Sequence, residues 1–402
     1  MRLLFKPHPL ALLIGAIGAI GAAACVPASA GVSDTIHPYL AVTRSYDANL
    51  FRLDDNSPGF GGPRGDTLMQ TQYGVLFDMP ISRQKLTGQF KQSRVKFDHY
   101  SELDYSGKDY LADLEWHIGN HLEGHIGGLY AQTLTSFSDF HSNQRNLRKQ
   151  RREYVDGAWR FHPSYRVRAA ASSQKFTYDL PQQQFNNRTE DQVDLGFDYL
   201  PHSGSRFGLQ VSQLKGKYPN HRFLGGTSID DGYTQNELKA NVYWLFSATS
   251  QFTMLAGWAE RKHTFFGERD SSGLNGRAKM NWSMLRKLRM DASVWREFAP
   301  VESNFVNNSL NKGASFSTTW DVSAKVNVNA AVRREKRDFS TLEGRIAPPN
   351  LHDKSRNASL GVNYAPLQSV RLSANVFHEV RSGNASTNYR THGAAVSASI
   401  QF

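Results

Sequence analysis

Residues 391–402 read THGAAVSASIQF, and they alternate strictly between apolar and small or polar side chains. Val396, Ala398, Ile400 and Phe402 fall on one side of a strand with period two, and the serines fall on the other. Two structures produce this pattern. One is the closing strand of an outer-membrane β-barrel, with lipid on one face and a polar lumen on the other. The other is the last strand of a soluble β-sandwich.

The beginning of the chain is typical of an export signal. Arg2 and Lys6 precede an apolar stretch over residues 10–24, and three small residues follow at 28–30. We predict a cleaved signal peptide over residues 1–30 and a single barrel domain over residues 31–402. A lipoprotein anchor at Cys25 is the alternative. Cleavage after Ala30 would remove this single cysteine, and the mature chain would then form no disulfide.

Charge narrows the range of partners. The full chain has a formal net charge of +11, and loss of Arg2 and Lys6 leaves +9. Such basicity favours anionic partners, here lipopolysaccharide phosphates or an acidic polysaccharide. Nucleic acid is excluded as a partner because the chain is exported. The mean hydropathy of −0.52 does not argue against a membrane barrel, because only alternate residues of its strands meet lipid.

The alternation of the last residues recurs along the whole chain. Segments of about ten residues, the length that a tilted strand needs to cross a bilayer, are separated by connections that are alternately short and long. Eight short turns and nine longer polar connections predict about eighteen strands, with both termini on the periplasmic side. The expected fold is an all-β, transmembrane, antiparallel up-and-down barrel. All the long connections are modest in length, which favours a wide or plugged pore over one narrowed by an inward loop.

If the apolar rows face lipid, the intervening rows face the lumen and carry many charges. Basic side chains in these rows would attract an anionic solute or chain, and aromatic rings among them would stack on sugars. The alternative is that inward arginines and carboxylates only pair across strands and stiffen the wall. The candidate residues of the substrate path are Arg166, Arg168, Lys239, Arg277, Lys279, Arg289, Arg333, Arg371, Tyr154, Tyr243 and Trp295.

The strongest local run of positive charge covers residues 145–152, at the end of an expected outer loop. It contains Arg145, Arg148, Lys149, Arg151 and Arg152. Arginines bind phosphate through two parallel hydrogen bonds, so the run is a candidate site for lipopolysaccharide phosphates or an exported acidic polymer. The alternative is a solvated loop tip.

Enzymatic motifs are weak in this sequence. There is no Gly-x-Ser-x-Gly, no His-Glu-x-x-His and no phosphate-binding loop. His117, His121 and His125 flank one tight turn and could bind a metal, but chance clustering explains them better. We therefore expect no enzyme, no cofactor and no metal site.

Two segments carry a resemblance to a known family. Residues 37–53, HPYLAVTRSYDANLFRL, and residues 97–105, FDHYSELDY, are similar to segments of EpsL-like outer-membrane proteins from exopolysaccharide gene clusters associated with exosortases. The matching positions are Asp47, Asn49, Arg52, Asp104 and Tyr105, for which the resemblance implies a structural or loop-anchoring role. It also implies a part in the biosynthesis or export of an extracellular polysaccharide.

These observations support three hypotheses. The first is a passive outer-membrane conduit for an exopolysaccharide, with the polymer and a periplasmic or inner-membrane export machinery as partners. The second is a general porin that prefers small anions, and the third is an outer-membrane hydrolase or a structural barrel. In each case the barrel would contact outer-membrane lipid and lipopolysaccharide. The terminal Phe402 would be the barrel-closing signal for the barrel assembly machinery.

Overall fold

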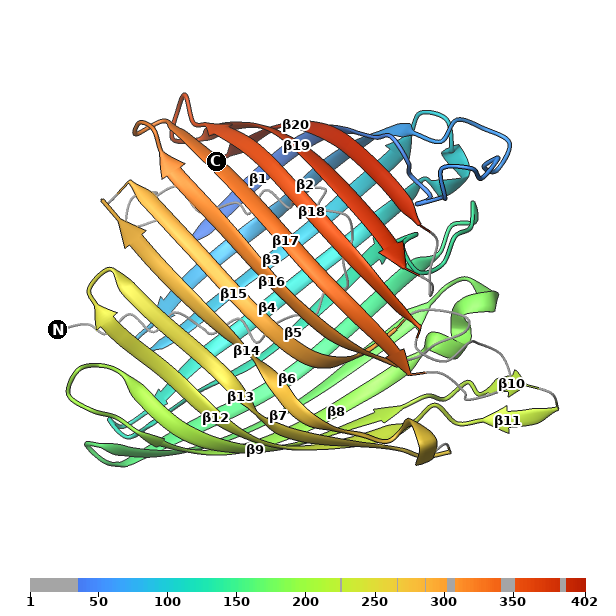
Figure 1. Ribbon diagram of the computed structural model, residues 1–402. Helices are drawn as coiled ribbons and strands as arrows, with labels where there is room; N and C mark the ends of the chain where they lie inside the picture. Colours follow the sequence, from blue (N-terminus) through green and yellow to red (C-terminus); the bar gives the residue numbers. More distant parts are fainter. Residues whose placement is uncertain are drawn as a thin grey trace.

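Strand β1 (Ile36–Asp47) pairs with the next strand in the chain and also with the last one, β20 (Tyr389–Gln401). The register with β20 runs from Tyr39 opposite Gln401 to Asp47 opposite Gly393. This pairing closes an 18-stranded antiparallel sheet into a barrel in the computed structural model (Figure 1). The predicted fold class and strand number are confirmed. Phe402 follows directly, and its backbone N–H donates to the carbonyl of Pro38 across the closure.

The structure describes residues 35–224, 226–265, 267–285, 287–301, 308–340, 351–383 and 388–402. The predicted signal peptide, residues 1–30, lies outside them. The remaining barrel strands are β2 (Asp66–Ile81), β3 (Gln84–Phe97), β4 (Tyr105–Ile118), β5 (Leu122–Leu134), β6 (Leu147–His162), β7 (Tyr165–Tyr178), β8 (Arg188–Tyr199), β9 (Arg206–Lys217), β12 (Tyr233–Ser247), β13 (Ser250–His263), β14 (Ser271–Met284), β15 (Leu288–Pro300), β16 (Asn308–Asp321), β17 (Val326–Ser340), β18 (His352–Tyr364) and β19 (Val370–Gly383).

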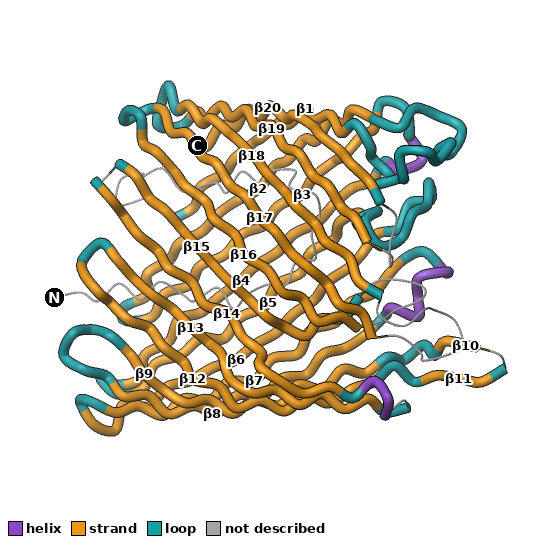
Figure 2. The backbone as a smooth tube through the Cα atoms, in the orientation of Figure 1, coloured by secondary structure: helices purple, strands orange, loops and turns teal. Residues whose placement is uncertain are grey.

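The two ends of the barrel differ, as Figure 2 shows. One end carries only tight turns, and we call it the turn end. The other, the loop end, carries longer connections and the 3-10 helices η1 (Ser101–Leu103), η2 (Pro181–Asn186) and η3 (Gly267–Arg269). None of these described helices has the length or apolar character to cross a membrane. The connection between β9 and β12 contains a short hairpin of β10 (Arg222–Leu224) and β11 (Thr227–Ile229).

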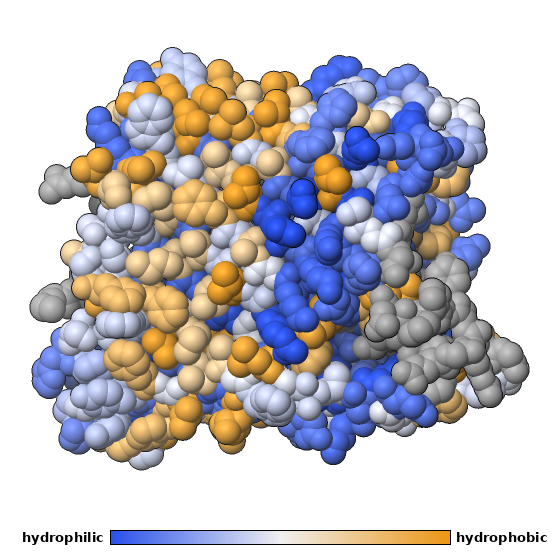
Figure 3. Space-filling model, in the orientation of Figure 1, coloured by the Kyte–Doolittle hydropathy of each residue, from blue (hydrophilic) through white to orange (hydrophobic). Residues whose placement is uncertain are grey.

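Outward side chains form an apolar band nearer the turn end. Leu238, Val332 and Leu360 each expose more than half of their surface, and similar residues repeat around the barrel. Figure 3 shows this band on one face. Moving a side chain such as leucine from water into hydrocarbon is favourable by ~1.5–3 kcal/mol. A basic residue at the bilayer midplane costs ~2–4 kcal/mol instead. The alternation of the strands therefore places the charged rows on the inside.

Candidate functional site

The inner wall of the barrel carries a cluster of charged and aromatic side chains on β14 to β17. The indole ring of Trp295 lies between two guanidinium groups, with the Cζ of Arg277 4.8 Å and that of Arg333 4.3 Å from its centre. Its Nε1–H donates to Glu335 at 2.9 Å. Glu297 binds Arg277 at 2.7 Å. Three residues of the predicted substrate path thus meet in one cluster, each held in place by an acidic partner or by the ring.

Two of the predicted lumen aromatics lie opposite a glycine on the neighbouring strand. Trp295 is paired with Gly313 on β16, where a Cβ would approach the ring to 2.3 Å. Tyr154 is paired with Gly127 on β5 in the same way, and its hydroxyl donates to Asp113 at 2.5 Å. A ring that covers a glycine lies along the sheet, close to the barrel wall. This arrangement follows from cross-strand register and so could not be assigned from spacing alone.

A second cluster lies toward the turn end, around the fully buried carboxylate of Asp198. Arg166 binds it at 2.8 Å and Arg168 at 2.7 Å. Arg166 also reaches Glu123 at 3.0 Å. Tyr243 lies 5.7 Å below the guanidinium of Arg206. The structure therefore brings Arg166 and Arg168 together, but as partners of one shared acid.

The other predicted path residues line the same inner face at separate points. Lys239 binds Glu237 at 2.6 Å, and Arg289 binds Asp321 at 2.8 Å. Lys279 makes no ion pair with any residue in the described part of the chain. Arg371 lies on β19, far from Lys279 in strand order. Most of the predicted basic lumen residues are thus paired with carboxylates, so the positive potential in the lumen is weaker than the basic residues alone would produce.

The loop end holds a small apolar core that covers part of the mouth. Phe51 is only 1% exposed and packs edge-on against Tyr100 and Phe137, with ring centres 4.7 and 5.0 Å apart. These rings come from three different connections, at residues 48–65, 98–104 and 135–146. We call this group the mouth cluster; it also contains Leu50, Leu53 and Leu103. Because it buries large apolar side chains away from the membrane band, it holds the three connections as one packed unit.

The connection over residues 135–146, here called the crossing loop, reaches the opposite wall. It joins β5 to β6, and its Asp139 binds Arg337 on β17 at 2.7 Å and Arg381 on β19 at 2.9 Å. Seven strands separate β5 from β17 in one direction around the ring and nine in the other. The loop therefore passes over the lumen. The modest length of the connections favours a wide or plugged pore, and this twelve-residue connection is nevertheless long enough to reach the opposite wall.

The docking site of the crossing loop is a buried ionic network. Arg337 also binds Asp353 at 2.5 Å, and the carbonyl of Ser138 accepts a hydrogen bond from Arg381 at 2.9 Å. Burial alone would raise the pKa of Asp139, but Arg337 and Arg381 hold that pKa well below its usual range. Asp139 is therefore charged at neutral pH, and electrostatic attraction fixes the loop to the far wall.

A histidine in the same loop contributes a second anchor. The Nδ1 of His141 lies 2.9 Å from the carbonyl oxygen of Phe51, at the centre of the mouth cluster. Burial lowers the pKa of His141, although the hydrogen bond to Phe51 opposes the shift. The docked loop thus favours the neutral imidazole, whose Nδ1–H donates to the carbonyl.

The residues that carried the family resemblance lie at the root of the first long connection. Arg52 has a left-handed backbone (φ 57°), and it binds Asp47 at 2.8 Å and Glu379 on β19 at 3.5 Å. Asn49 donates to the carbonyls of Leu53 and Arg390. At the next connection, Asp104 accepts from the backbone N–H of Phe97, and Tyr105 packs against the mouth cluster. These contacts tie residues 48–65 and the start of β4 to the wall.

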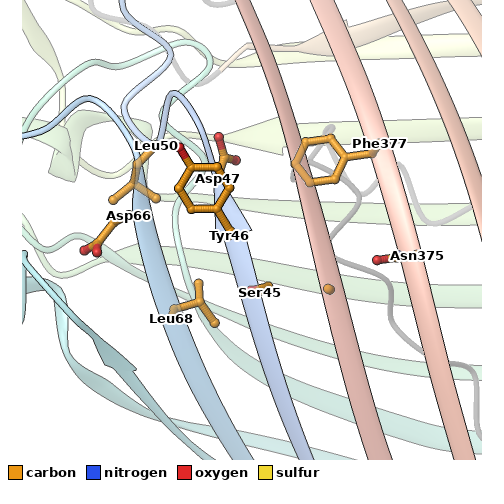
Figure 4. A pocket seen from close by; sticks show the side chains of 9 residues that line it. Ser45, Tyr46, Asp47, Leu50, Asp66, Leu68, Asn375 and Phe377 are labelled. Carbon is orange, nitrogen blue, oxygen red and sulfur yellow. The ribbon is translucent and has the colours of Figure 1, made fainter.

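A small pocket lies where this first connection meets the wall (Figure 4). Leu50, a member of the mouth cluster, contributes to its lining from the connection itself. The rest of the lining comes from β1, β2, β19 and β20: Ser45, Tyr46, Asp47, Asp66, Leu68, Asn375, Phe377 and Ala395. The pocket therefore belongs to the junction that seats the connection on the strands.

The basic run at residues 145–152 is divided between the two faces of the wall. Arg151 and Lys149 point outward and bind Glu153 and Asp179. Arg148 is buried, and Arg152 lies 5.7 Å above the ring of Tyr154 in the lumen. Because β6 begins at Leu147, successive side chains of the run point alternately outward and into the lumen. Only Arg145 belongs to the loop, and it donates to the carbonyl of Asp104. The run is not one continuous patch.

The three histidines beside the tight turn have separate partners. His125 lies 3.0 Å from Asp113, His117 lies 3.6 Å from Glu115, and His121 contacts the carbonyl of Arg160. In the described part of the chain, no group of three or more histidine, cysteine or acidic side chains is arranged to hold a metal ion.

Asp139, Arg337 and Arg381 were missed by reasoning from sequence. Each sits in a strand end or short loop with no local motif, and the partners are about 200 residues or more apart in the chain. One signal of this network is present in the sequence: Arg337 and Asp353 both fall on the inward face of neighbouring strands, where they can form an ion pair.

Comparisons place this fold among known structures. No family model and no curated protein matches the chain. OccK1 (OpdK) from Pseudomonas aeruginosa superposes with a TM-score of 0.51 at 11% identity, over 91% of this chain and 99% of that one. A structure of the same protein with vanillate gives the same TM-score, identity and coverage. OccAB3 from Acinetobacter baumannii covers the same shares with a TM-score of 0.48 at 11% identity. At this identity the likeness establishes the fold alone, which is that of an outer-membrane β-barrel protein.

Proposed function

We propose that this protein is an outer-membrane channel for small solutes, with a preference for anions, and that the crossing loop forms its narrowest part. The observation that carries the proposal is the contact of Asp139 with Arg337 and Arg381 across the lumen. A loop held over the pore by a buried ionic network reduces the cross-section through which a solute passes. A channel of this kind suits compact solutes better than a hydrated polymer chain.

The outer membrane is the proposed location because the exposed apolar rows require a hydrocarbon environment. A contiguous apolar belt exposed to water on a soluble barrel would cause aggregation. The short turns and both ends of the barrel chain would then face the periplasm, and the mouth cluster would face outward.

Anion preference is supported by the excess of positive charge and by one lumen cation in particular. The chain carries 47 basic against 36 acidic residues, and Lys279 has no acidic partner among the described residues. Charged rings that line a pore select ions of the opposite sign. OpdK in complex with vanillate, a small carboxylate, suggests a suitable class of probe.

The experiment is a measurement of reversal potential in planar bilayers under a KCl gradient. We expect an anion-selective potential that shifts toward zero in Lys279→Gln, because the substitution removes an unpaired lumen charge. Lys262→Gln is the matched control, since Lys262 points outward and binds Glu260. Cation selectivity of the wild-type channel would contradict the proposed preference.

Export of an exopolysaccharide is the second candidate function. It is favoured by the resemblance at Asp47, Asn49 and Arg52. Deletion of the gene followed by assay of surface and periplasmic polysaccharide would separate the two functions. Loss of surface polymer would favour export, whereas normal polymer with altered uptake of small anions would favour the channel. A structural barrel would show neither effect.

A further inference from the structure

The outer surface of β15 to β18 changes character abruptly toward the loop end. On β17, Val326, Val328, Ala330 and Val332 point outward, and the next two outward residues are Arg334 and Lys336. The neighbouring strands change from hydrophobic to hydrophilic at a similar height, as Figure 3 shows for this face. We call the six outward cations of these strands the cationic row: Arg296, Lys312, Arg334, Lys336, Lys354 and Arg356.

The cations of the row face each other in register. Arg296 is opposite Lys312, Lys312 is opposite Lys336, and Lys336 is opposite Lys354. Arg334 is likewise opposite Arg356. Directly opposed side chains in antiparallel strands have Cβ atoms about 4.5–5.5 Å apart, and like charges at this spacing repel each other. Four neighbouring strands thus present like charges where alternation of sign would be more stable.

Protein carboxylates leave most of this charge unbalanced. Among the described outward residues of β15 to β18, the only acid is Asp338, which binds Lys312 at 3.1 Å and Lys336 at 2.7 Å. Arg334, Lys354 and Arg356 make no ion pair with any described residue.

Several outward cations on other strands have a carboxylate partner. Arg151 binds Glu153, Lys217 binds Asp191 and Lys262 binds Glu260, so each has a carboxylate of its own. The cationic row differs from these sites because its four strands have a single outward acid among their described residues.

The height of the row places it at the edge of the hydrocarbon. From Val326 to Arg334 the strand advances eight residues, which is about 20 Å along the barrel axis at ~3.3 Å per residue and ~45° tilt. The apolar band of outer-membrane barrels is about 25 Å tall, with lipid headgroups above it. The side chains of the row therefore end at the level of headgroup phosphates on the loop side.

We propose that the cationic row binds the phosphate groups of a phosphorylated glycolipid in the outer leaflet. The proposal goes beyond the channel function and rests on the proposed membrane location, with the loop end outward. A phosphate between two strands would bridge opposed cations and relieve their repulsion. Arg334 and Arg356 would each present a planar guanidinium that matches two phosphate oxygens, and the lysines would add positive charge. The valines below the row would contact the acyl chains of the same lipid.

The test is native mass spectrometry of the purified, delipidated barrel with bisphosphorylated lipid A and with its dephosphorylated form. We expect the phosphorylated lipid to bind at least tenfold more tightly. The row variant carries four substitutions, and we expect it to lose this difference: Arg334→Gln, Lys336→Gln, Lys354→Gln and Arg356→Gln.

A matched control removes the same number of outward charges elsewhere. It is expected to bind like the wild type, because each of its cations has an acidic partner in the protein: Lys149→Gln, Arg151→Gln, Lys217→Gln and Lys262→Gln. Heat-dependent mobility in gel electrophoresis reports whether each variant is folded. If the row variant does not fold, the smaller change Lys354→Gln with Arg356→Gln is expected to weaken binding several-fold.

Three results would overturn the proposal. Equal loss of binding in the row and control variants would mean that only overall charge matters. Equal binding of the phosphorylated and dephosphorylated lipids would exclude phosphate recognition. Displacement of the lipid by millimolar inorganic phosphate would indicate an unspecific anion site. Channel conductance is measured separately, so failure of this proposal leaves the proposed channel intact.

Discussion

The carboxylate of Asp139 lies 2.7 Å from the guanidinium of Arg337, although the two residues belong to nearly opposite sides of the barrel. This contact holds the twelve-residue crossing loop over the lumen. It also accounts for the low pKa of Asp139, since Arg337 and Arg381 outweigh the effect of burial.

Removal of the charge at Asp139 should release the crossing loop. Asp139→Asn keeps the shape of the side chain but weakens charge-assisted hydrogen bonds, each worth about 1.5–3 kcal/mol. We expect a higher and noisier single-channel conductance in planar bilayers. Asp191→Asn is the control, because that carboxylate binds Lys217 on the outer face. Unchanged conductance in Asp139→Asn would show that the crossing loop does not limit the current.

Acidification should loosen the same loop through His141. Burial lowers its pKa in the docked loop, whereas a released loop would titrate near the ordinary value of about 6.5. Docking is thus fully stable above that pH and weakens as pH falls below it, because the released loop takes up the proton more readily. Conductance should rise between pH 7 and pH 5 in the wild type. The rise should be absent in His141→Gln, and its persistence there would assign the effect to another group.

The packing of Trp295 on Gly313 predicts a steric effect on the channel. A Cβ at residue 313 would lie 2.3 Å from the indole, so Gly313→Ala must push the ring off the wall. We expect a lower single-channel conductance, because the displaced ring enters the lumen. The double variant Gly313→Ala with Trp295→Ala should recover it. Gly267→Ala is the control, since a Cβ there meets no other atom. Failure of the double variant to recover would exclude the ring as the obstruction.

The buried carboxylate of Asp198 contributes both to the stability of the folded barrel and to the ion selectivity of the channel. Asp198→Asn leaves Arg166 and Arg168 without their shared partner, and breaking a buried ion pair from one side costs about 3–5 kcal/mol. The temperature of heat-induced unfolding, followed by gel mobility, should fall clearly. Anion selectivity should increase at the same time, because two cations lose their neutralising charge. Glu260→Gln, at an outward site that binds Lys262, should change neither quantity much.

The alternation of side chains predicts the barrel because strand period is a local property. Rows such as Leu238, Ala240 and Val242 identify a lipid-facing strand without knowledge of any other part of the chain. Opposite parity likewise places Arg277 and Lys279 on the inner face. Loop docking is different in kind: the contact of Asp139 with Arg337 spans 198 residues, and no local pattern encodes it. The same limit applies to the cationic row, which becomes visible only when β15 to β18 are aligned in register.

Exclusion of neutral polymers from the open channel tests the central claim most directly. Single-channel conductance of the wild-type protein is measured with polyethylene glycols of increasing size in the bath. Polymers that enter the pore lower the current, and excluded ones do not. The account predicts a sharp cut-off at small polymers in the wild type, and a shift of that cut-off to larger polymers in Asp139→Asn. Entry of large polymers into the wild-type channel, with no change in Asp139→Asn, would contradict it.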